Sequence, residues 1–513
     1  MTTVNPDTAT AGPRTPCAAA AGPRTPTVNL KVPAVAVREV RLNTITGFEG
    51  SAEALVRESC QGGPSERERS FTQCLGCSTG NAACMVTLEQ DGVVISHGPV
   101  GCSACLHEFA FTYRVNAPLR GVERPTQRHI YSTNLTEDET VFGGNEKLAA
   151  AIREVYGRER PNVVFIITTC ASGIIGDDVE GVANEAEEEL GIPVVAIFCE
   201  GFRSKVWTSG FDAGYHGIAR KLIKPPRKKR PVVNVINFWG SDVFTRWFEP
   251  LGVEASYLTP YATLDSLEHA SEALASVQIC TTLGSYLSGV LEREFGVPAL
   301  RAAPPYGVPA TERWLRALGE LLGRPEAVER IIAAEREEFL PQIEGLRKRL
   351  KGRTAYVTAG AGHGHALLAL LGELGMTARG AALFHHDPIN DIGSEEADSL
   401  VARVRDYGDV PQVSICNKQE FELVNVLNRM RPDVLLARHG GMTLWGAKLG
   451  IPSLLVGDEQ WGMGYRGVVN YGKAILEVME NNEFVTNLAR HAVNPYTAWW
   501  LEQRPSYFLE PVP

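Results

Sequence analysis

The feature that most constrains the fold is a repeated alternation of short apolar runs with amphipathic helical patterns. The apolar runs end in turn residues, which is typical of strands buried on both faces of a parallel sheet. Strands that alternate with helices form parallel sheets with crossover helices, so the sequence predicts an α/β fold. The predicted strands are Asn162–Thr168, Pro193–Phe198, Val232–Phe238, Val277–Thr281, Ala355–Thr358, Ala381–Phe384, Asp433–Ala437 and Pro452–Val456.

Helical patterns lie between these runs, and two breaks in the pattern suggest domain boundaries. The predicted helices are Glu146–Tyr156, Val179–Leu190, Ser285–Phe295, Glu326–Leu350, Ala366–Leu374, Glu420–Met430 and Met442–Leu449. A chain of 513 residues is too long for one core. The breaks are the basic, proline-rich stretch Lys224–Pro231 and the end of the charged helix near Lys351. We therefore expect three Rossmann-like domains with flanking helices, at residues 39–228, 229–350 and 351–513.

Composition narrows the class of protein and its location. The formal net charge of −10 argues against a nucleic-acid surface, and Lys224–Pro231 is more typical of a solvated linker. No apolar run is long enough to span a membrane. Met1–Pro26 contains A-G-P-R-T-P twice and lacks the apolar segment of a signal peptide, so residues 1–38 are expected to form a disordered tail. We expect a cytoplasmic protein whose eleven cysteines are reduced thiols or metal ligands.

Four cysteines stand in settings that suggest ligand chemistry. Cys77 lies in C-L-G-C-S-T-G, Cys102 ends H-G-P-V-G-C, Cys170 begins C-A-S-G-I-I-G-D-D, and Cys280 lies in V-Q-I-C-T-T. Two of them follow predicted strands, and ligands of open α/β sheets bind beyond the carboxyl ends of the strands. Soft thiolate ligands in such a crevice favour iron–sulfur clusters.

Other interpretations of the cysteines remain open. Cys74 and Cys77 with Cys102 and Cys105 have the pairing of a zinc ribbon, but the 24 residues between the pairs exceed its usual spacing. Cys74 or Cys84 is an alternative to Cys77 as the first ligand. Cys105 and Cys199 are expected to be plain buried thiols. Asp177 and Asp178 lie where a helix begins, and a structural capping role is expected for them.

The order of these motifs resembles the α-type subunit of nitrogenase component 1, over about Gly76 to Tyr471. The resemblance is carried by H-G-P-V-G-C (His97–Cys102), C-x-x-x-I-I-G-D-D (Cys170–Asp178), C-E-G-F-R (Cys199–Arg203) and the single Cys280. It implies the nitrogenase component 1 fold. It further implies that Cys77, Cys102 and Cys170 hold half of an eight-iron P-cluster, and that Cys280 anchors an active-site iron–sulfur cofactor.

The resemblance also implies partners. The P-cluster would be shared with a homologous β-type subunit in an α2β2 heterotetramer. A homodimeric, ATP-dependent iron protein would supply electrons. No nucleic acid and no membrane are expected as partners.

The chain departs from true nitrogenases where the cofactor would lie. Trp207 and Phe211 replace a glutamine and a histidine that help deliver protons, and they give a more apolar pocket. The second cofactor ligand maps to Gly457, so Asp458, Glu459, His385 and His386 are the remaining candidates. The lysine that contacts homocitrate maps to Gly441. These differences imply an iron–sulfur cofactor related to the nitrogenase cofactor precursor, without homocitrate and without a heterometal.

The segment Cys199–Ala213 is similar to the pocket loop of methylthio-alkane reductases. That resemblance implies reductive cleavage of the C–S bond of a small thioether, giving methanethiol with ethylene, ethane or methane. A scaffold subunit for nitrogenase cofactor assembly, a divergent nitrogenase and a dark-operative tetrapyrrole reductase are the alternatives, although the last needs no cluster anchor such as Cys280. The candidate proton donors are His363, His365, His385, His386 and His439, in turns at predicted strand ends.

Overall fold

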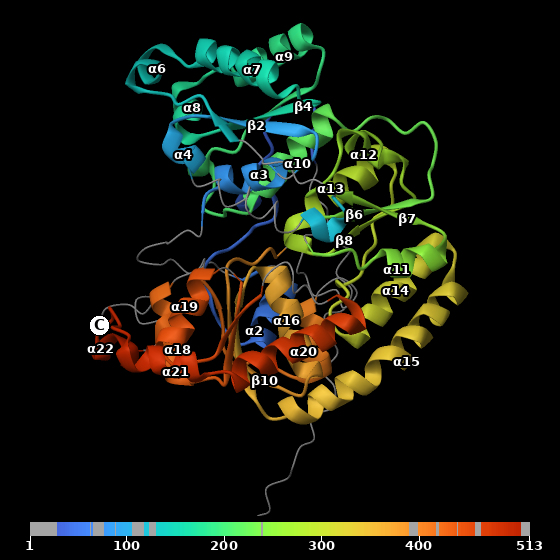
Figure 1. The fold of residues 1–513 in the computed structure, drawn as a ribbon, viewed down its shortest axis with the longest axis vertical. Coiled ribbons are helices and arrows are strands. Elements are labelled where there is room, and N and C mark those ends of the chain that lie inside the picture. Colours follow the sequence, from blue (N-terminus) through green and yellow to red (C-terminus); the bar gives the residue numbers. More distant parts are fainter. Residues whose placement is uncertain are drawn as a thin grey trace, which may run out of the picture.

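A computed structural model describes the chain in segments. They are residues 28–61, 63–64, 76–87, 89–104, 117–122, 130–237, 240–388, 399–416, 420–438, 440–456 and 463–503. Several residues singled out from the sequence therefore lie outside the described part of the chain: Cys74, Cys105, His439, Gly457, Asp458 and Glu459. The described residues form three sheets, each with its own helices, arranged along the long axis of the molecule (Figure 1).

The first unit, at the top of Figure 1, is a parallel sheet of order β3-β2-β4-β5. Adjacent residues of its strands pack on opposite faces, so the sheet is buried on both sides. Val94 and Phe165 face a core shared with α3 and α10, whereas Ile95 and Ile166 face α7 and α9. The elements are α3 (Ser78–Thr87), β2 (Gly92–His97), α4 (Val100–Ala104), η1 (Ala117–Arg120), β3 (Ile130–Ser132), α6 (Glu137–Phe142), α7 (Asn145–Glu159), β4 (Val163–Thr168), α8 (Cys170–Ile175), α9 (Val179–Leu190), β5 (Val194–Ile197), η2 (Gly201–Arg203) and α10 (Ser209–Lys221).

The second unit is a smaller parallel sheet of order β7-β6-β8. Its core is aromatic, and the rings of Phe248 and Trp314 are stacked with their centroids 6.5 Å apart. The elements are β6 (Val232–Ile236), α11 (Thr245–Phe248), η3 (Glu249–Leu251), β7 (Glu254–Leu258), α12 (Leu264–Glu268), η4 (Ala270–Glu272), β8 (Ala275–Gln278), α13 (Thr281–Phe295) and α14 (Val308–Leu322).

The third unit, at the bottom of Figure 1, is a sheet of order β1-β11-β10-β9-β12-β13, in which β1 is antiparallel and the other strands are parallel. The long helix α15 reaches it from the second unit and packs against α20. The elements are β1 (Phe48–Gly50), α2 (Ala52–Cys60), α15 (Pro325–Leu350), β9 (Thr354–Ala359), α16 (Ala361–Glu373), β10 (Thr377–Leu383), α17 (Ser399–Tyr407), β11 (Val413–Ile415), α18 (Glu420–Met430), β12 (Val434–Ala437), α19 (Gly440–Lys448), β13 (Ser453–Leu455), α20 (Gly464–Glu480), α21 (Glu483–His491) and α22 (Ala498–Glu502).

The N-terminal part of the chain joins the units in a way that differs from the domain boundaries expected from sequence. Val28, Leu30 and Val35 pack against the core between the first and second units, although residues 1–38 are expected to form a tail. The short helix α1 (Arg38–Arg41) follows, and then β1 and α2 join the third unit. In Figure 1 the blue helix α2 lies among the orange elements of that unit. The disorder signal of the repeats ends near Pro26, and the apolar residues that follow pack into cores.

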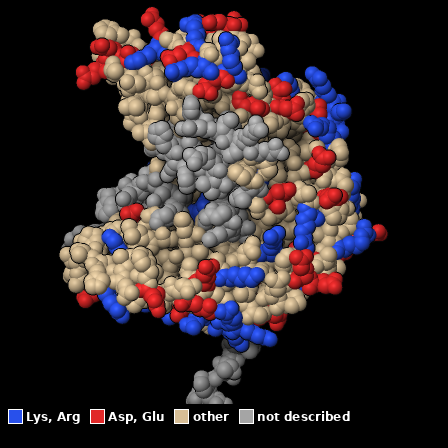
Figure 2. Space-filling view, in the orientation of Figure 1, with Lys and Arg blue, Asp and Glu red and all other residues tan. Residues whose placement is uncertain are grey.

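The surface carries charged side chains of both signs. On the face shown in Figure 2, basic and acidic side chains are interspersed. Among the described helices, none is both long and apolar enough to cross a membrane.

A buried carboxyl group in the third unit leads to a prediction about pH. Glu373, at the end of α16, accepts the Val308 N–H at 2.8 Å. Burial raises the pKa of Glu373 to about 7, against the effect of the Val308 N–H and Arg347. Because the folded state holds the proton more tightly than the unfolded chain, stability should fall as the pH rises from about 4.5 to 7.

We expect the free energy of unfolding of the wild type to fall by about 3 kcal/mol between pH 5 and pH 8 because of Glu373. In Glu373→Gln this decrease should be absent. Thermal unfolding of both proteins at these two pH values measures this difference. Glu326→Gln, at an exposed carboxylate in the first turn of α15, is the control and should leave the pH dependence as it is. The same pH dependence in wild type and Glu373→Gln would contradict the assignment.

Candidate functional site

Two thiols follow neighbouring strands of the first sheet. β2 and β4 are parallel and in register, with His97 opposite Thr168. Cys102 lies on α4 just after β2, and Cys170 begins α8 directly after β4. The two loops approach so closely that a Cβ on Gly98 would lie 2.2 Å from the Thr169 hydroxyl oxygen. Glycine is therefore needed in H-G-P-V-G-C to bring the two cysteine loops together.

Cys77 meets Cys170 over a third glycine-containing motif. A Cβ built on Gly201, in C-E-G-F-R, would lie 3.0 Å from the Cys77 Cβ, 3.6 Å from its Sγ and 3.5 Å from the Cys170 Sγ. Gly201 thus leaves a space next to the two sulfur atoms, and the side chain of any larger residue would fill it. The thiols of these two distant sequence motifs can use this space for a sulfur-ligated group.

The surroundings of this thiol group are apolar and open. Cys77 is exposed, and Cys102 and Cys170 are half-buried. Val100, Ile174 and Phe202, each a close sequence neighbour of the group, have exposed fractions of 60%, 76% and 57%. Large apolar side chains exposed beside potential ligands are typical of a surface that a partner covers.

A buried histidine–aspartate pair supports the two cysteine loops. His97 Nε2 lies 2.9 Å from Asp177 Oδ2, and His97 Nδ1 lies 3.1 Å from the Thr133 hydroxyl. Asp177 also accepts the Gly144 N–H at 2.8 Å. Burial lowers the pKa of His97, although the hydrogen bond with Asp177 opposes the shift. The structural role expected for Asp177 is confirmed, and Asp178 caps α9 by accepting the Gly181 N–H.

The other described cysteines differ from these three. Cys199 is buried and its thiol donates to the Thr168 carbonyl at 3.4 Å; burial and then Glu200 raise its pKa. Cys84 and Cys416 are buried thiols that form no disulfide. Cys60 is disulfide-bonded, which corrects the expectation that every cysteine is reduced or metal-bound. Within the described segments, no three His, Cys, Asp or Glu side chains converge on a single ion. The zinc-ribbon alternative stays untested, because Cys74 and Cys105 lie outside those segments.

The second candidate site surrounds Cys280, where the three units meet. Cys280 is the N-cap residue of α13, just beyond β8, and its thiol is buried. Burial raises the pKa of this thiol, while the Leu283 N–H, Thr282 and the Arg38 guanidinium act against that shift. The start of α16 is close, since the Gly362 N–H donates to the Thr282 hydroxyl at 3.4 Å.

Aromatic side chains form an apolar wall of this region. Trp207 lies just before α10 and Phe211 lies in its first turn; their rings are edge to face with centroids 6.1 Å apart. The Trp207 ring also meets His385 edge to face at 6.5 Å. Both aromatic residues are buried in the core between the first and second units. The structure thus brings Trp207, Phe211 and His385 together.

The candidate histidines have different surroundings. His385 is 1% exposed, and its Nδ1 lies 3.4 Å from Asp387 Oδ1, while its Nε2 makes no hydrogen bond to a described residue. His386 contacts the Ser59 hydroxyl at 2.7 Å and pairs by its backbone with Ile45, so it binds the N-terminal segment.

His363 and His365 lie near the start of α16 and are also buried. Burial lowers the pKa of His363 to about 3, and Arg438 acts in the same direction. The His363 ring packs against Tyr306.

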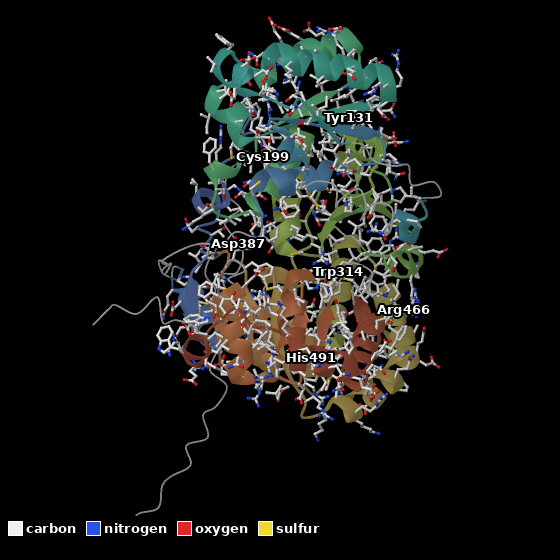
Figure 3. All side chains as sticks on the ribbon, turned by 60° about the vertical axis from the view of Figure 1, so that its left-hand side comes forward. Tyr131, Cys199, Trp314, Asp387, Arg466 and His491 are labelled. Atoms are coloured by element: carbon white, nitrogen blue, oxygen red, sulfur yellow. The ribbon has the colours of Figure 1, made fainter. Side chains whose placement is uncertain are left out.

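An arginine that sequence reasoning missed lies at the centre of this site. Arg38 is fully buried and donates to Asp212 by Nε and Nη2, both at 2.9 Å. Its Nη1 donates to Asp387 at 3.2 Å, and its Nη2 also donates to the Thr282 carbonyl. Figure 3 places Asp387 at the junction of the upper unit, which carries Cys199, and the lower unit. Asp212 lies in the segment Cys199–Ala213 and Asp387 directly follows His386, but nothing in the sequence connected the two carboxylates to Arg38.

Comparison with known proteins now decides the family. The model of the family described as nitrogenase component 1 type oxidoreductase matches residues 77–480. The chain belongs to this family. The match begins at Cys77 and includes Cys102, Cys170 and Cys280, so both candidate sites lie within the family region.

Relatives in the nitrogenase component 1 family include two kinds of protein. The chain is 28% identical to the nitrogenase molybdenum-iron protein alpha chain of Methanothermobacter marburgensis, over 79% of this chain and 87% of that relative. It is 26% identical to the nitrogenase iron-molybdenum cofactor biosynthesis protein NifE of Methanococcus maripaludis, over 86% of this chain and 89% of that relative. It is thus an α-type or NifE-like chain of this family.

A solved structure gives the fold. The structure titled "Nitrogenase Cp1 at pH 6.5" matches with a TM-score of 0.68 at 22% identity, covering 84% of this chain and 94% of that chain. The predicted α/β fold with parallel sheets, of the nitrogenase component 1 kind, is confirmed.

The contacts of Asp177 that support the loops of Cys102 and Cys170 can be tested. We expect Asp177→Ala to lower the free energy of unfolding by about 3 kcal/mol, because it leaves the buried Gly144 N–H and the His97 ring without their acceptor. Asp178→Ala removes only a helix cap at the next position and should cost about 1 kcal/mol. Urea unfolding of both variants measures the difference. Equal losses would contradict a special role for Asp177.

Proposed function

We propose that this chain is the catalytic α-type subunit of a nitrogenase-like reductase that cleaves the C–S bond of small methylthio-alkanes. The observation that carries the proposal is the group of buried side chains that Arg38 connects around Cys280. Cys280 is a buried thiol near Arg38. The ring of Trp207 contacts Phe211 and the buried imidazole of His385. These two residues lie beside Asp212 and Asp387, the two carboxylates bound by Arg38. The apolar rings suit the alkyl groups of an uncharged thioether. Reduction of dinitrogen would instead need the proton-relaying side chains that Trp207 and Phe211 replace.

The first thiol group would hold half of a P-cluster. Cys77, Cys102 and Cys170 supply soft thiolates from three loops, and the space over Gly201 suits a group that both Cys77 and Cys170 reach. The open, apolar rim supports completion of this site by a β-type subunit in an α2β2 heterotetramer. A homodimeric, ATP-dependent iron protein would be the electron donor. A complete eight-iron cluster in the chain purified alone would contradict this assignment.

The second site would hold an iron–sulfur cofactor on Cys280, with Asp458, Glu459 or a histidine as further candidate ligands. The donor set fits a sulfur-rich group, since Cys280 is a buried thiol. Gly441, in α19, offers no cation where homocitrate would need one. We therefore propose a cofactor without homocitrate and heterometal. When bound, it would supply electrons and soft iron sites for the thioether sulfur.

The protein residues would orient the substrate and deliver protons. Cleavage of R–S–CH₃ consumes two electrons and two protons and gives R–H and CH₃SH. Trp207 and Phe211 would pack against the alkyl groups and exclude water. His385 is the best-placed donor, because Asp387 faces its Nδ1 and leaves Nε2 available for a proton transfer. The low pKa of His363 and the Ser59 contact of His386 make these two less suitable.

A NifE-like scaffold for cofactor assembly is the second candidate function. The cofactor biosynthesis relative supports it, since its alignment covers 86% of this chain. Both functions need Cys280, but only the reductase needs a proton donor and turnover.

The first test concerns where the iron is bound. Cys280→Ala should remove the iron and the electron paramagnetic resonance signal of the active-site cofactor and abolish turnover, because its proposed thiolate anchor is lost. Cys102→Ala should instead reduce the P-cluster and the yield of the complex with the β-type subunit. Iron analysis and the resonance spectrum after anaerobic purification measure both effects. Cys416→Ala, at a buried thiol of the third unit, is the control and should retain both clusters. Normal turnover of Cys280→Ala would overturn the proposal.

The second test concerns the reaction. The purified complex with its iron protein, MgATP and a reductant should convert dimethyl sulfide to methanethiol and methane. His385→Gln should lower this rate by about 100-fold while retaining the cofactor iron. A complex that donates its cofactor to an apo-nitrogenase but never releases methanethiol would favour the scaffold. One molybdenum or vanadium ion for each active site would contradict the proposed cofactor.

A further inference from the structure

A single guanidinium group connects all three units beside Cys280. Arg38 donates to Asp212 of α10 in the first unit, to the Thr282 carbonyl of α13 in the second unit and to Asp387 after β10 in the third unit. Its side chain has no exposed surface. These contacts span 174, 244 and 349 positions of sequence, so they form only in the assembled fold.

The charges of this cluster balance. Arg41 adds a second guanidinium, with its Nη2 2.5 Å from Asp212 Oδ2, and Thr44 donates to Asp387 at 2.5 Å. Burial alone would raise the pKa of Asp387, but His385 and Arg38 hold it well below its usual range. Buried ion pairs are tolerated only in a well-defined geometry, because a misplaced charge loses its partner and keeps its desolvation cost. The cluster therefore fixes the relative positions of the segments that it joins.

Each partner of Arg38 lies beside a residue of the candidate site. Thr282 lies in the first turn of α13, two positions after Cys280. Asp212 directly follows Phe211 on α10. Asp387 faces the imidazole of His385. A displacement of Arg38 would thus move the thiol, the apolar wall and the proposed proton donor together.

We propose that Arg38 is a positioning residue of the cofactor site, and that the N-terminal segment 28–47 which carries it is an integral part of that site. The part of this inference that concerns catalysis rests on the proposed function. Its structural content, that Arg38 keeps the Cys280 loop closed, is independent of it. The fork of the guanidinium matters, because the single ammonium of a lysine cannot contact Asp212, Asp387 and the Thr282 carbonyl in the same directions.

The experiment compares Arg38→Lys with a matched control. Arg403→Lys alters another buried arginine, which donates to the Leu368 and Gly408 carbonyls within the third unit. Both variants are prepared as the full chain with the β-type subunit. One set of these proteins is purified from iron-depleted cells. In this set, mass spectrometry measures the rate at which iodoacetamide alkylates each cysteine. In the other set, the cofactor signal, kcat and KM are measured.

We expect Arg38→Lys to increase the alkylation rate of Cys280 about tenfold, because the loop opens more often, while Cys416 keeps its protection. In the iron-loaded complex it should change the line shape of the cofactor signal and lower kcat about tenfold, with the P-cluster signal unchanged. Arg403→Lys should change none of these. A protected Cys280 with a wild-type signal in Arg38→Lys would overturn the inference. Cys280 of Arg38→Lys could be alkylated faster, as expected, while even the wild type binds no cofactor. In that case the proposed function fails and the positioning role of Arg38 stands.

Discussion

Parallel strands place their carboxyl ends at one edge of a sheet, and the rest of this structure depends on that constraint. In the first sheet the register of β2 and β4 brings the loops of Cys102 and Cys170 together. In the second sheet the end of β8 presents Cys280. In the third sheet His385 follows β10. The residues with ligand and proton chemistry thus come from strand ends of all three units, and the packing of the units decides which of them meet.

The packing of the units is in turn linked to a small group of buried charges. Apolar cores join the first and second units but do not by themselves select one relative position, since aliphatic contacts tolerate small shifts. The pairs of Arg38 with Asp212 and Asp387 are directional, and breaking one leaves a charge in a buried place. A site built at the meeting point of three units therefore gains its geometry from polar contacts more than from the cores around it.

The sequence predicted the long elements well and the long-range contacts poorly. Each of the eight predicted strands overlaps an observed one, because their apolar runs are long enough to show burial on both faces. Five of the described strands were missed. β1, β3 and β11 have only three residues each and are held by their neighbours in the ladder. β2 begins with a glycine and ends in Ser96 and His97, and β7 is mostly not buried, so neither shows a long apolar run. Arg38 could not have been found, because it lies beside a repetitive segment typical of disorder and its partners are hundreds of positions away. The roles of the candidate site residues stay predictions.

The two thiol sites differ in burial, and this difference suits two different tasks. Cys77, Cys102 and Cys170 are accessible beside exposed apolar side chains, so a group held there could be shared with a partner and exchange electrons with it. Cys280 is buried near the Arg38 guanidinium, so chemistry there would be protected from water and would depend on protons from the protein itself. An enzyme that reduces an apolar substrate needs this separation, because reduced metal centres open to water would pass their electrons to protons before the substrate binds.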